Sequence, residues 1–110
     1  MNDDTLRPQR VSATQAPTWL AAHADALRLD ARDAQHHAQG HLSGSLRLDG
    51  RNHERLLLSV PKDRPVFIYC YHGNASRSYA QMFRDFGFRH VVDLIGGWEA
   101  WQQQAGDRTR

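Results

Sequence analysis

An unbroken apolar run, a glycine-containing polar loop and an amphipathic segment follow one another in the second half of this sequence, and this succession constrains the fold most. The run at residues 65–69, Pro-Val-Phe-Ile-Tyr, is typical of a strand covered on both faces. After the loop, apolar side chains recur at positions i, i+3, i+4 and i+7 of one helix stripe: Tyr79, Met82, Phe83 and Phe86. Gly87 stands where a glycine ends a helix, and residues 91–95 predict the next strand. Strand, loop, helix and strand form a βαβ unit, which predicts a parallel sheet.

The first half of the chain alternates in the same way. Residues 27–31 and 45–48 are predicted strands, Ser12 or Thr14 is expected to cap a first helix, and Asn52 can cap another. The chain has 110 residues, of which 40% are hydrophobic, and this is enough for one domain with its own core. The sequence therefore predicts an α/β sandwich around a mostly parallel sheet.

The single cysteine, Cys70, directly follows the predicted buried strand and lies a few residues before the predicted helix. Ligands of open α/β sheets bind beyond the carboxyl ends of the strands, and a loop that enters a helix points free backbone N–H groups at one spot. Gly73 can adopt the positive φ of a tight loop, and Asn74 tolerates it better than most residues. The helix dipole also favours a thiolate. The spacing indicates an anion-binding loop with a nucleophilic sulfur at its floor; the alternative is a small buried residue that ends a strand.

Four segments together resemble the single-domain rhodaneses, a family of thiosulfate sulfurtransferases. The first is similar to the active-site loop of that family: Cys70-Tyr71-His72-Gly73-Asn74-Ala75-Ser76. Residues 30–32 resemble its Asp-x-Arg element, residues 40–45 its Gly-His-Ile-x-Gly-Ala turn, and residues 96–101 its closing Gly-Gly-aromatic-x-x-Trp element. The resemblance implies a three-layer α/β/α rhodanese fold around a mostly parallel five-stranded sheet. It implies one domain over residues 8–106, with flexible ends at residues 1–7 and 107–110.

The resemblance also implies a reaction, thiosulfate:cyanide sulfur transfer without a cofactor or a metal. The Cys70 thiolate would take the outer sulfur of thiosulfate as a persulfide and pass it to cyanide or to a thiol acceptor such as thioredoxin or dihydrolipoate. Cys70 is the predicted catalytic residue. The predicted substrate-binding residues are Tyr71, His72, Gly73, Asn74, Ala75, Ser76 and Arg77. Residues predicted to be structural near the site are Asp30, Arg32 and His41.

One position departs from the family pattern. Many rhodaneses have arginine or lysine at the sixth position of the loop, where this chain has Ala75. The backbone amides must then bind more of the substrate anion, with Arg77 or His72 as candidate helpers. Arg77 falls in the first turn of the predicted helix, where a cation opposes the helix dipole, so a substrate contact is one interpretation and a solvated arginine is the other.

Three other functions fit parts of the same pattern. A cysteine phosphatase or arsenate reductase needs Cys-x5-Arg to hold its oxyanion bidentately, but the required position is Ser76, and Arg77 comes one residue too late. A persulfide carrier supplied by a partner protein would use the same cysteine chemistry. A non-catalytic rhodanese-like binding module would capture a partner without turnover.

Composition and charge argue against several further classes. Lys plus Arg number 14 against 12 Asp plus Glu, and the arginines do not cluster with aromatic residues, so nucleic-acid binding is not predicted. The apolar stretch at residues 66–71 is far shorter than the roughly 20 residues of a membrane helix. Acidic residues follow Met1 and no apolar segment comes after them, so the expected location is cytoplasmic. His36, His37 and His41 have no thiolate or paired carboxylate near them in the sequence, and a zinc site is not predicted.

Overall fold

The chain folds around a five-stranded sheet in which every strand pair is parallel. The computed structural model describes residues 8–108, with side chains described as far as residue 104. The strand order is β1-β5-β4-β2-β3, and the strands are β1 (Gln9–Val11), β2 (Leu27–Asp30), β3 (Leu46–Arg47), β4 (Val66–Tyr69) and β5 (Val91–Leu94). The helices are α1 (Ala16–Ala22), α2 (Ala34–Gln39), α3 (His53–Ser59), α4 (Ala75–Asp85) and α5 (Gly97–Arg108). The predicted α/β class and five-stranded sheet are confirmed.

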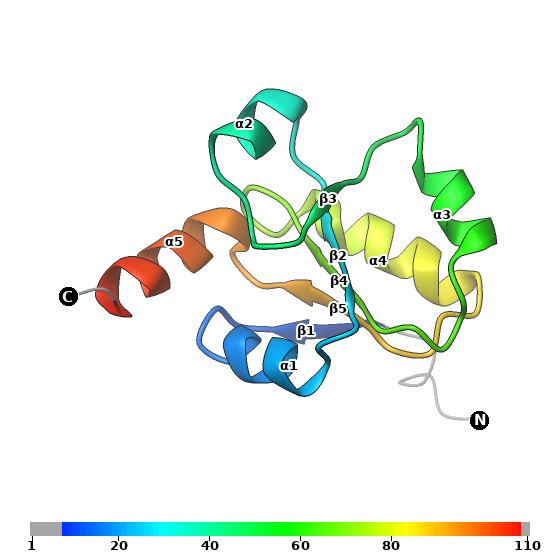
Figure 1. Cartoon of the computed structure of the whole chain (residues 1–110), viewed down its shortest axis with the longest axis horizontal. Coiled ribbons are helices and arrows are strands. Elements are labelled where there is room, and N and C mark those ends of the chain that lie inside the picture. Colours follow the sequence, from blue (N-terminus) through cyan, green and yellow to red (C-terminus); the bar gives the residue numbers. More distant parts are fainter. Residues whose placement is uncertain (1–7, 109–110) are drawn as a thin grey trace.

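Helices cover both faces of the sheet, which gives the three predicted layers (Figure 1). On one face of the sheet, Leu57 of α3 and Phe83 of α4 belong to a first cluster of buried hydrophobic residues. On the other face, Leu20 of α1 packs into a second cluster together with the partly buried Trp98 of α5. Strand β4 lies in the middle of the sheet, and all four of its residues are buried. The continuous apolar run that predicted this strand therefore reflects cover on both faces.

Two elements are absent from the sequence-based prediction. Strand β1 is only three residues long, and of these only Val11 is buried, so it carries no hydrophobic pattern; its place comes from parallel pairing with β5. Helix α2 buries none of its residues, and it begins where the Asp33 carboxylate accepts the His36 N–H at 2.8 Å. Both elements are short and polar, and tertiary pairing or a local cap specifies them instead of periodicity.

The predicted apolar stripe of α4 is wrong in part. Phe83 is fully buried and Tyr79 is half-buried, but Met82 is 39% exposed and Phe86 is 48% exposed. The buried face consists of Ser76, Ala80 and Phe83. Small side chains at Ser76 and Ala80 let the helix approach the sheet, and a hydrophobicity pattern gives small residues little weight.

The predicted end of α4 at Gly87 is confirmed. Gly87 has a φ of 95°, and its N–H donates to the Arg84 carbonyl at 2.9 Å. The next N–H, of Phe88, donates to the Phe83 carbonyl at 3.1 Å. The two rings of Phe83 and Phe88 pack edge to face. This is a Schellman ending with its apolar contact, and it directs the chain into β5.

The other helix ends differ from expectation. Helix α1 begins after Gln15, which has no side-chain cap, and Ser12 Oγ accepts the Gln15 N–H one turn earlier. Asn52 does stand at the start of α3, but its side chain binds Asp49 and Arg47 and caps no helical N–H.

At the carboxyl end, α5 continues through residues 107 and 108, which the sequence analysis assigned to a flexible end. The predicted flexible segments at residues 1–7 and 109–110 lie outside the described residues. Within residues 8–108, no helix is long and apolar enough to cross a membrane.

Candidate active site

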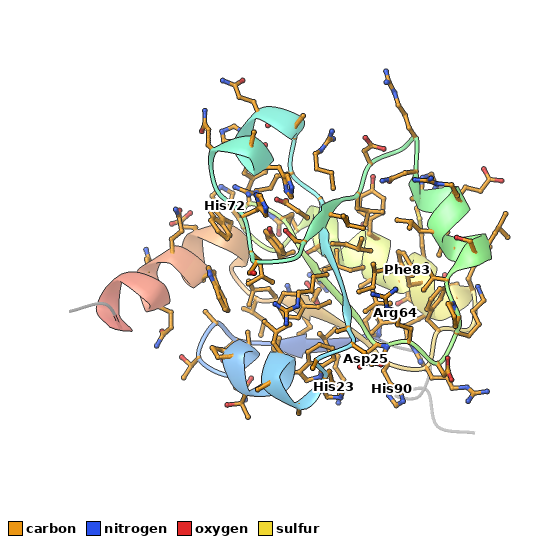
Figure 2. All side chains as sticks on the ribbon, in the orientation of Figure 1. His23, Asp25, Arg64, His72, Phe83 and His90 are labelled. Carbon is orange, nitrogen blue, oxygen red and sulfur yellow. The ribbon has the colours of Figure 1, made fainter. Side chains whose placement is uncertain are left out.

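Cys70 follows the central strand β4 directly, and the loop that it opens ends at the start of α4. Figure 2 shows His72 of this loop in the upper left part of the view, whereas Asp25, Arg64 and His90 lie near one another toward the lower right. The latter three precede strands β2, β4 and β5, so they mark the amino ends of the sheet. The cysteine loop therefore lies at the carboxyl edge, where ligands of parallel sheets bind.

Hydrogen-bond donors from the loop and from α4 converge on the Cys70 sulfur. The backbone N–H of Gly73 lies 3.2 Å from Sγ, and that of Ser76 lies 3.4 Å from it. The His72 N–H also binds the sulfur, and the Ser76 hydroxyl lies 3.4 Å away. Such a concavity of N–H groups at a helix N-terminus stabilises an anion at its centre.

Three carbonyl groups of the loop accept hydrogen bonds from α5 and β1. Trp98 N–H at the start of α5 donates to the Cys70 carbonyl at 2.7 Å, and Glu99 N–H donates to the Tyr71 carbonyl at 3.3 Å. The Arg10 guanidinium donates to the Gly73 carbonyl at 2.9 Å. Of these three peptides, only the one between Tyr71 and His72 carries an N–H that binds Sγ, so the contacts mainly anchor the loop against α5 and β1.

Two glycines permit this close packing of loop and helix. Gly73 has a φ of 91°, and a Cβ there would lie 2.9 Å from the Gly96 nitrogen. Gly97 has a φ of 60°, and a Cβ there would lie 2.4 Å from the Cys70 carbonyl oxygen. A side chain at either position would require the backbone to move. The glycine predicted from the loop sequence, Gly73, thus has the predicted positive φ, and Gly97 brings α5 against the loop.

The Cys70 side chain is almost completely buried, with 2% of its surface exposed. Burial opposes ionisation and would raise the pKa of the thiol. The hydrogen bond with the Ser76 hydroxyl and those from the amides of Ser76, Gly73 and His72 outweigh it and hold the pKa below its ordinary value. A purely structural cysteine would share the burial, but it would not need donors converging on its sulfur.

The other predicted loop residues point away from Sγ. His72 Nδ1 lies 2.8 Å from the Glu99 carboxylate of α5, and both side chains are exposed. Tyr71 Oη lies 3.0 Å from His36 Nδ1 and joins the loop to α2. Ala75 is the exposed first residue of α4. None of these three side chains contacts the sulfur, and among the described residues only backbone groups and Ser76 bind it directly.

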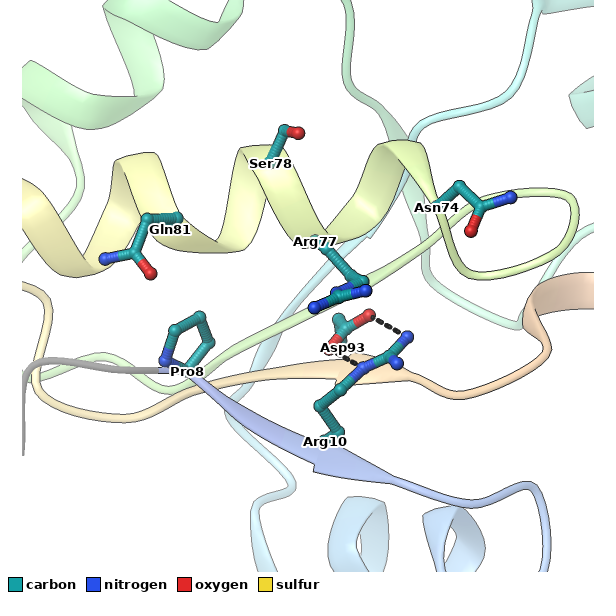
Figure 3. Close-up of a pocket in the computed structure, with 7 residues that line it drawn as sticks. All are labelled: Pro8, Arg10, Asn74, Arg77, Ser78, Gln81 and Asp93. Atoms are coloured by element: carbon teal, nitrogen blue, oxygen red, sulfur yellow. Dashed lines mark hydrogen bonds and ion pairs between the residues drawn. The ribbon is translucent and has the colours of Figure 1, made fainter. Parts of the chain in front are cut away.

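Arg77 lies on the side of α4 that faces β1 and β5 (Figure 3). It lines a cavity of about 550 Å³ together with Asn74, Arg10 and Asp93, and Cys70 does not line this cavity. The Arg77 guanidinium makes no hydrogen bond or ion pair within the part of the chain that the structure describes. The structure thus places Arg77 beside the Arg10–Asp93 pair and not among the donors to Sγ.

The sequence analysis missed two charged residues next to the site. Asp93 is 1% exposed on β5, and Arg10 of the neighbouring β1 binds both of its carboxylate oxygens at 3.0 Å. Asp93 also accepts the Ser76 hydroxyl at 3.1 Å. A signal for Asp93 was present, because it is the only charged residue within the apolar run at 91–95. Arg10 carried no signal, since β1 itself was not predicted.

Asp30 and Arg32 form a buried ion pair at the end of β2, with an Arg32 Nη2–Asp30 Oδ2 distance of 2.9 Å. Arg32 also donates to the Gly40 carbonyl, and its guanidinium lies 4.6 Å from the Trp98 ring. Burial alone would raise the pKa of Asp30, but hydrogen bonds from Arg32 and His37 hold it below its ordinary value. These contacts join the turn after α2 to α5.

His41, the third residue predicted to be structural, is exposed and lies in the turn after α2. Its Nδ1 is 2.7 Å from the His37 carbonyl, and its ring stacks on that of His37. Over the side chains of residues 8–104, no three His, Cys, Asp or Glu residues gather in a group that could hold a metal ion.

The sequence matches a known family over most of its length. The model of the rhodanese-like domain matches residues 16–104. The chain is 40% identical over 94 residues to "Thiosulfate sulfurtransferase GlpE" of Ectopseudomonas mendocina, covering 86% of this chain and 84% of that protein. It is 37% identical over 94 residues to the protein of the same name from Pseudomonas paraeruginosa, with the same coverage.

Solved structures agree on the architecture. A rhodanese-like domain from Anabaena sp. superposes with a TM-score of 0.75 at 26% identity, covering 89% of this chain and 75% of that chain. A Rhodopseudomonas palustris protein described as of unknown function and a possible tyrosine phosphatase superposes with a TM-score of 0.77 at 21% identity, covering 89% and 82%. The second likeness concerns the fold alone. The family match, the sequence relatives and the five-stranded parallel sheet together establish that this chain belongs to the rhodanese-like domain family.

Proposed function

We propose that this protein is a thiosulfate sulfurtransferase in which Cys70 carries the transferred sulfur as a persulfide. The observation that carries the proposal is the convergence of the His72, Gly73 and Ser76 amides on the Cys70 sulfur. The GlpE relatives are named for this activity, and they match the chain over most of its length. The lowered pKa of the thiol supports the nucleophilic form of the cysteine.

The first step is attack of the Cys70 thiolate on the outer sulfur of thiosulfate. A new S–S bond forms at Sγ, the S–S bond of thiosulfate breaks, and its electron pair leaves with sulfite. The total charge of −3 is conserved, because the persulfide keeps one negative charge and sulfite carries two. The amides around Sγ stabilise charge that stays on sulfur throughout, so no proton transfer is needed at this step.

The second step is removal of the outer sulfur by an acceptor. Cyanide attacks that sulfur, the bond to Sγ breaks, and thiocyanate leaves with the Cys70 thiolate restored. A thiol such as that of dihydrolipoate or thioredoxin would take the same sulfur as its own persulfide. The loop has Ala75 where an arginine or lysine could bind the donor anion, so in this proposal backbone amides bind that anion. Thiosulfate is small, which suits a cysteine that is only 2% exposed.

The geometry argues against phosphate chemistry. Among the described residues, the donors to Sγ are backbone amides, the Ser76 hydroxyl accepts from the thiol, and no guanidinium binds the sulfur. A hydroxyl cannot replace the bidentate guanidinium that such enzymes need.

Steady-state kinetics with thiosulfate and cyanide test the proposed function. A persulfide intermediate requires that sulfite leave before cyanide reacts, so double-reciprocal plots at several cyanide concentrations should be parallel. Hydrolysis of an aryl phosphate serves as the counter-assay and should be at background. Intersecting lines would show that both substrates must bind together and would contradict the persulfide route. Thiosulfate-independent phosphatase turnover would replace it with the rival function.

A further inference from the structure

The structure contains a hydrogen-bonded chain of side chains that leads from the reactive sulfur to the edge strand of the sheet. Cys70 Sγ lies 3.4 Å from Ser76 Oγ, and Ser76 Oγ donates to Asp93 Oδ2 at 3.1 Å. Arg10 then binds both oxygens of Asp93 and, with the same Nη2, the Gly73 carbonyl of the loop. Arg10 and Asp93 are direct neighbours in the register of β1 and β5, so the sheet itself holds them together.

The side chains that link the sulfur to the edge strand are unusually buried for polar groups. Ser76 is 0% exposed and Asp93 is 1% exposed, and Asp93 occupies a position in a strand whose other residues are all buried and apolar. A buried carboxylate is costly unless a charged partner and hydrogen bonds compensate it. Leucine or valine at position 93 would pack without this cost, and a structural account of Asp93 must explain why the strand carries a charge there.

We infer that Arg10 is a positioning residue: by pairing with Asp93 it lets the Ser76 hydroxyl turn from that carboxylate to Sγ, and so favours the Cys70 thiolate. This inference rests on the proposed function, because it concerns the nucleophile of that reaction. In the thiol form, the Cys70 S–H donates a hydrogen bond to Ser76 Oγ, and the Ser76 hydroxyl donates a hydrogen bond to Asp93. When the thiol loses its proton to solvent, the Ser76 hydroxyl rotates and donates to Sγ. Asp93 can release that hydroxyl because Arg10 still supplies two N–H donors and neutralises its charge.

Other charged groups surround the loop, and they bear on the same sulfur. Arg77 lies on α4, His72 and Glu99 form an exposed pair between the loop and α5, and Asp30 pairs with Arg32 at the end of β2. None of these side chains is hydrogen-bonded to Ser76 or to Sγ within the described residues. Among the residues that the structure describes, Asp93 alone is joined to the sulfur through the side chain of Ser76.

The test measures the alkylation rate of Cys70 by iodoacetamide as a function of pH. Cys70 is the only cysteine of the chain, so the rate reports this sulfur alone. The wild-type profile should have an apparent pKa below the value of about 8.5 for a free thiol. In Arg10→Met, the Ser76 hydroxyl stays hydrogen-bonded to Asp93 and does not turn to Sγ. The negative charge of Asp93 is then no longer neutralised, and it lies close to the sulfur. The apparent pKa should then rise by about 1 unit, which is a tenfold slower reaction below the pKa.

A second substitution makes the inference independent of how well the first variant folds. Asp93→Asn removes the negative charge while keeping the side chain's shape, so the apparent pKa should not rise. In the double variant Arg10→Met with Asp93→Asn it should return to within about 0.3 units of wild type, since there is no carboxylate left to compensate. If the Arg10–Asp93 pair had only a structural role, the apparent pKa of Cys70 in the double variant would be shifted at least as far from wild type as in Arg10→Met.

The matched control is Arg47→Met. Arg47 also sits on an edge strand, in an ion pair with Asp49 in which its side chain is 32% exposed, against 35% for Arg10. Its removal changes the net charge by the same amount and should leave the Cys70 profile unchanged. Equal shifts for Arg47→Met and Arg10→Met would reduce the effect to net charge and overturn the inference. Because alkylation needs no sulfur donor, this result is distinguishable from a failure of the proposed sulfur transfer.

Discussion

Replacing Cys70 by serine should reduce thiocyanate formation from thiosulfate and cyanide to the background rate while leaving the fold intact. Serine is nearly isosteric, and the groups around Sγ are hydrogen-bond donors and a hydroxyl that can bind an oxygen as well as a sulfur. The serine hydroxyl does not ionise near neutral pH and cannot form a persulfide, so the chemical step is lost and not merely slowed. The measurement is the thiocyanate assay, with the thermal unfolding temperature as the check on folding.

A displaced thiol is the control for this variant. Ser59 is an exposed residue of α3, far along the chain from the loop, and Ser59→Cys in the Cys70→Ser background restores the number of thiols but not their environment. This double variant should stay inactive, because an exposed thiol lacks the ring of amides. Wild-type turnover in Cys70→Ser, or recovered turnover with the thiol at position 59, would show that the cysteine loop does not perform the reaction.

Replacing Arg32 by methionine should destabilise the fold by about 3–5 kcal/mol at pH 7, because the substitution leaves the Asp30 carboxylate buried without its cation. The Asp30 side chain is 0% exposed, and that of Arg32 is 3% exposed. In the variant, His37 and the Tyr69 hydroxyl remain as partners of Asp30. Urea denaturation followed by tryptophan fluorescence measures the loss.

The pH dependence of this loss has a definite sign. In the native protein the folded-state pKa of Asp30 is lowered, so its stabilising contribution is complete above the ordinary carboxyl pKa and disappears as the pH falls through the folded value. The difference between wild type and Arg32→Met should therefore shrink below about pH 4. Arg28→Met is the control: this residue lies on the same strand, and within the described part of the chain its guanidinium binds only the exposed Ser43 carbonyl, so the substitution should cost less than about 1 kcal/mol. Equal losses for the two variants would contradict the assignment of a buried pair.

The central part of the fold could be predicted because its pattern is strong and local. The run at β4 is apolar on both faces, and the glycine after α4 and the loop before it carry their own conformational signals. Features that depend on packing between distant segments were harder to predict from the sequence. The stripe of α4 was misplaced because Ser76 and Ala80, and not Met82 and Phe86, face the sheet. A helix that must approach strands closely selects small residues, which periodicity does not weigh.

Part of the candidate site could likewise be predicted from local sequence, and part depends on contacts between distant segments. Cys70 and the glycine of its loop follow from the order strand, loop, helix, and the structure places the expected amides around the sulfur. The pair Arg10 and Asp93 could not be predicted, because it joins residues 83 positions apart through a strand of three residues. A lone acid in an apolar strand shows that a partner exists, but only the sheet order shows which one.

Intact-protein mass spectrometry after brief treatment with thiosulfate and removal of the excess tests the central claim most directly. One cysteine in the chain means that any added sulfur is assigned without ambiguity. We expect one added mass of about 32 Da, lost again on addition of cyanide and absent from Cys70→Ser. An unchanged mass under conditions in which thiocyanate is being formed would contradict a persulfide on Cys70.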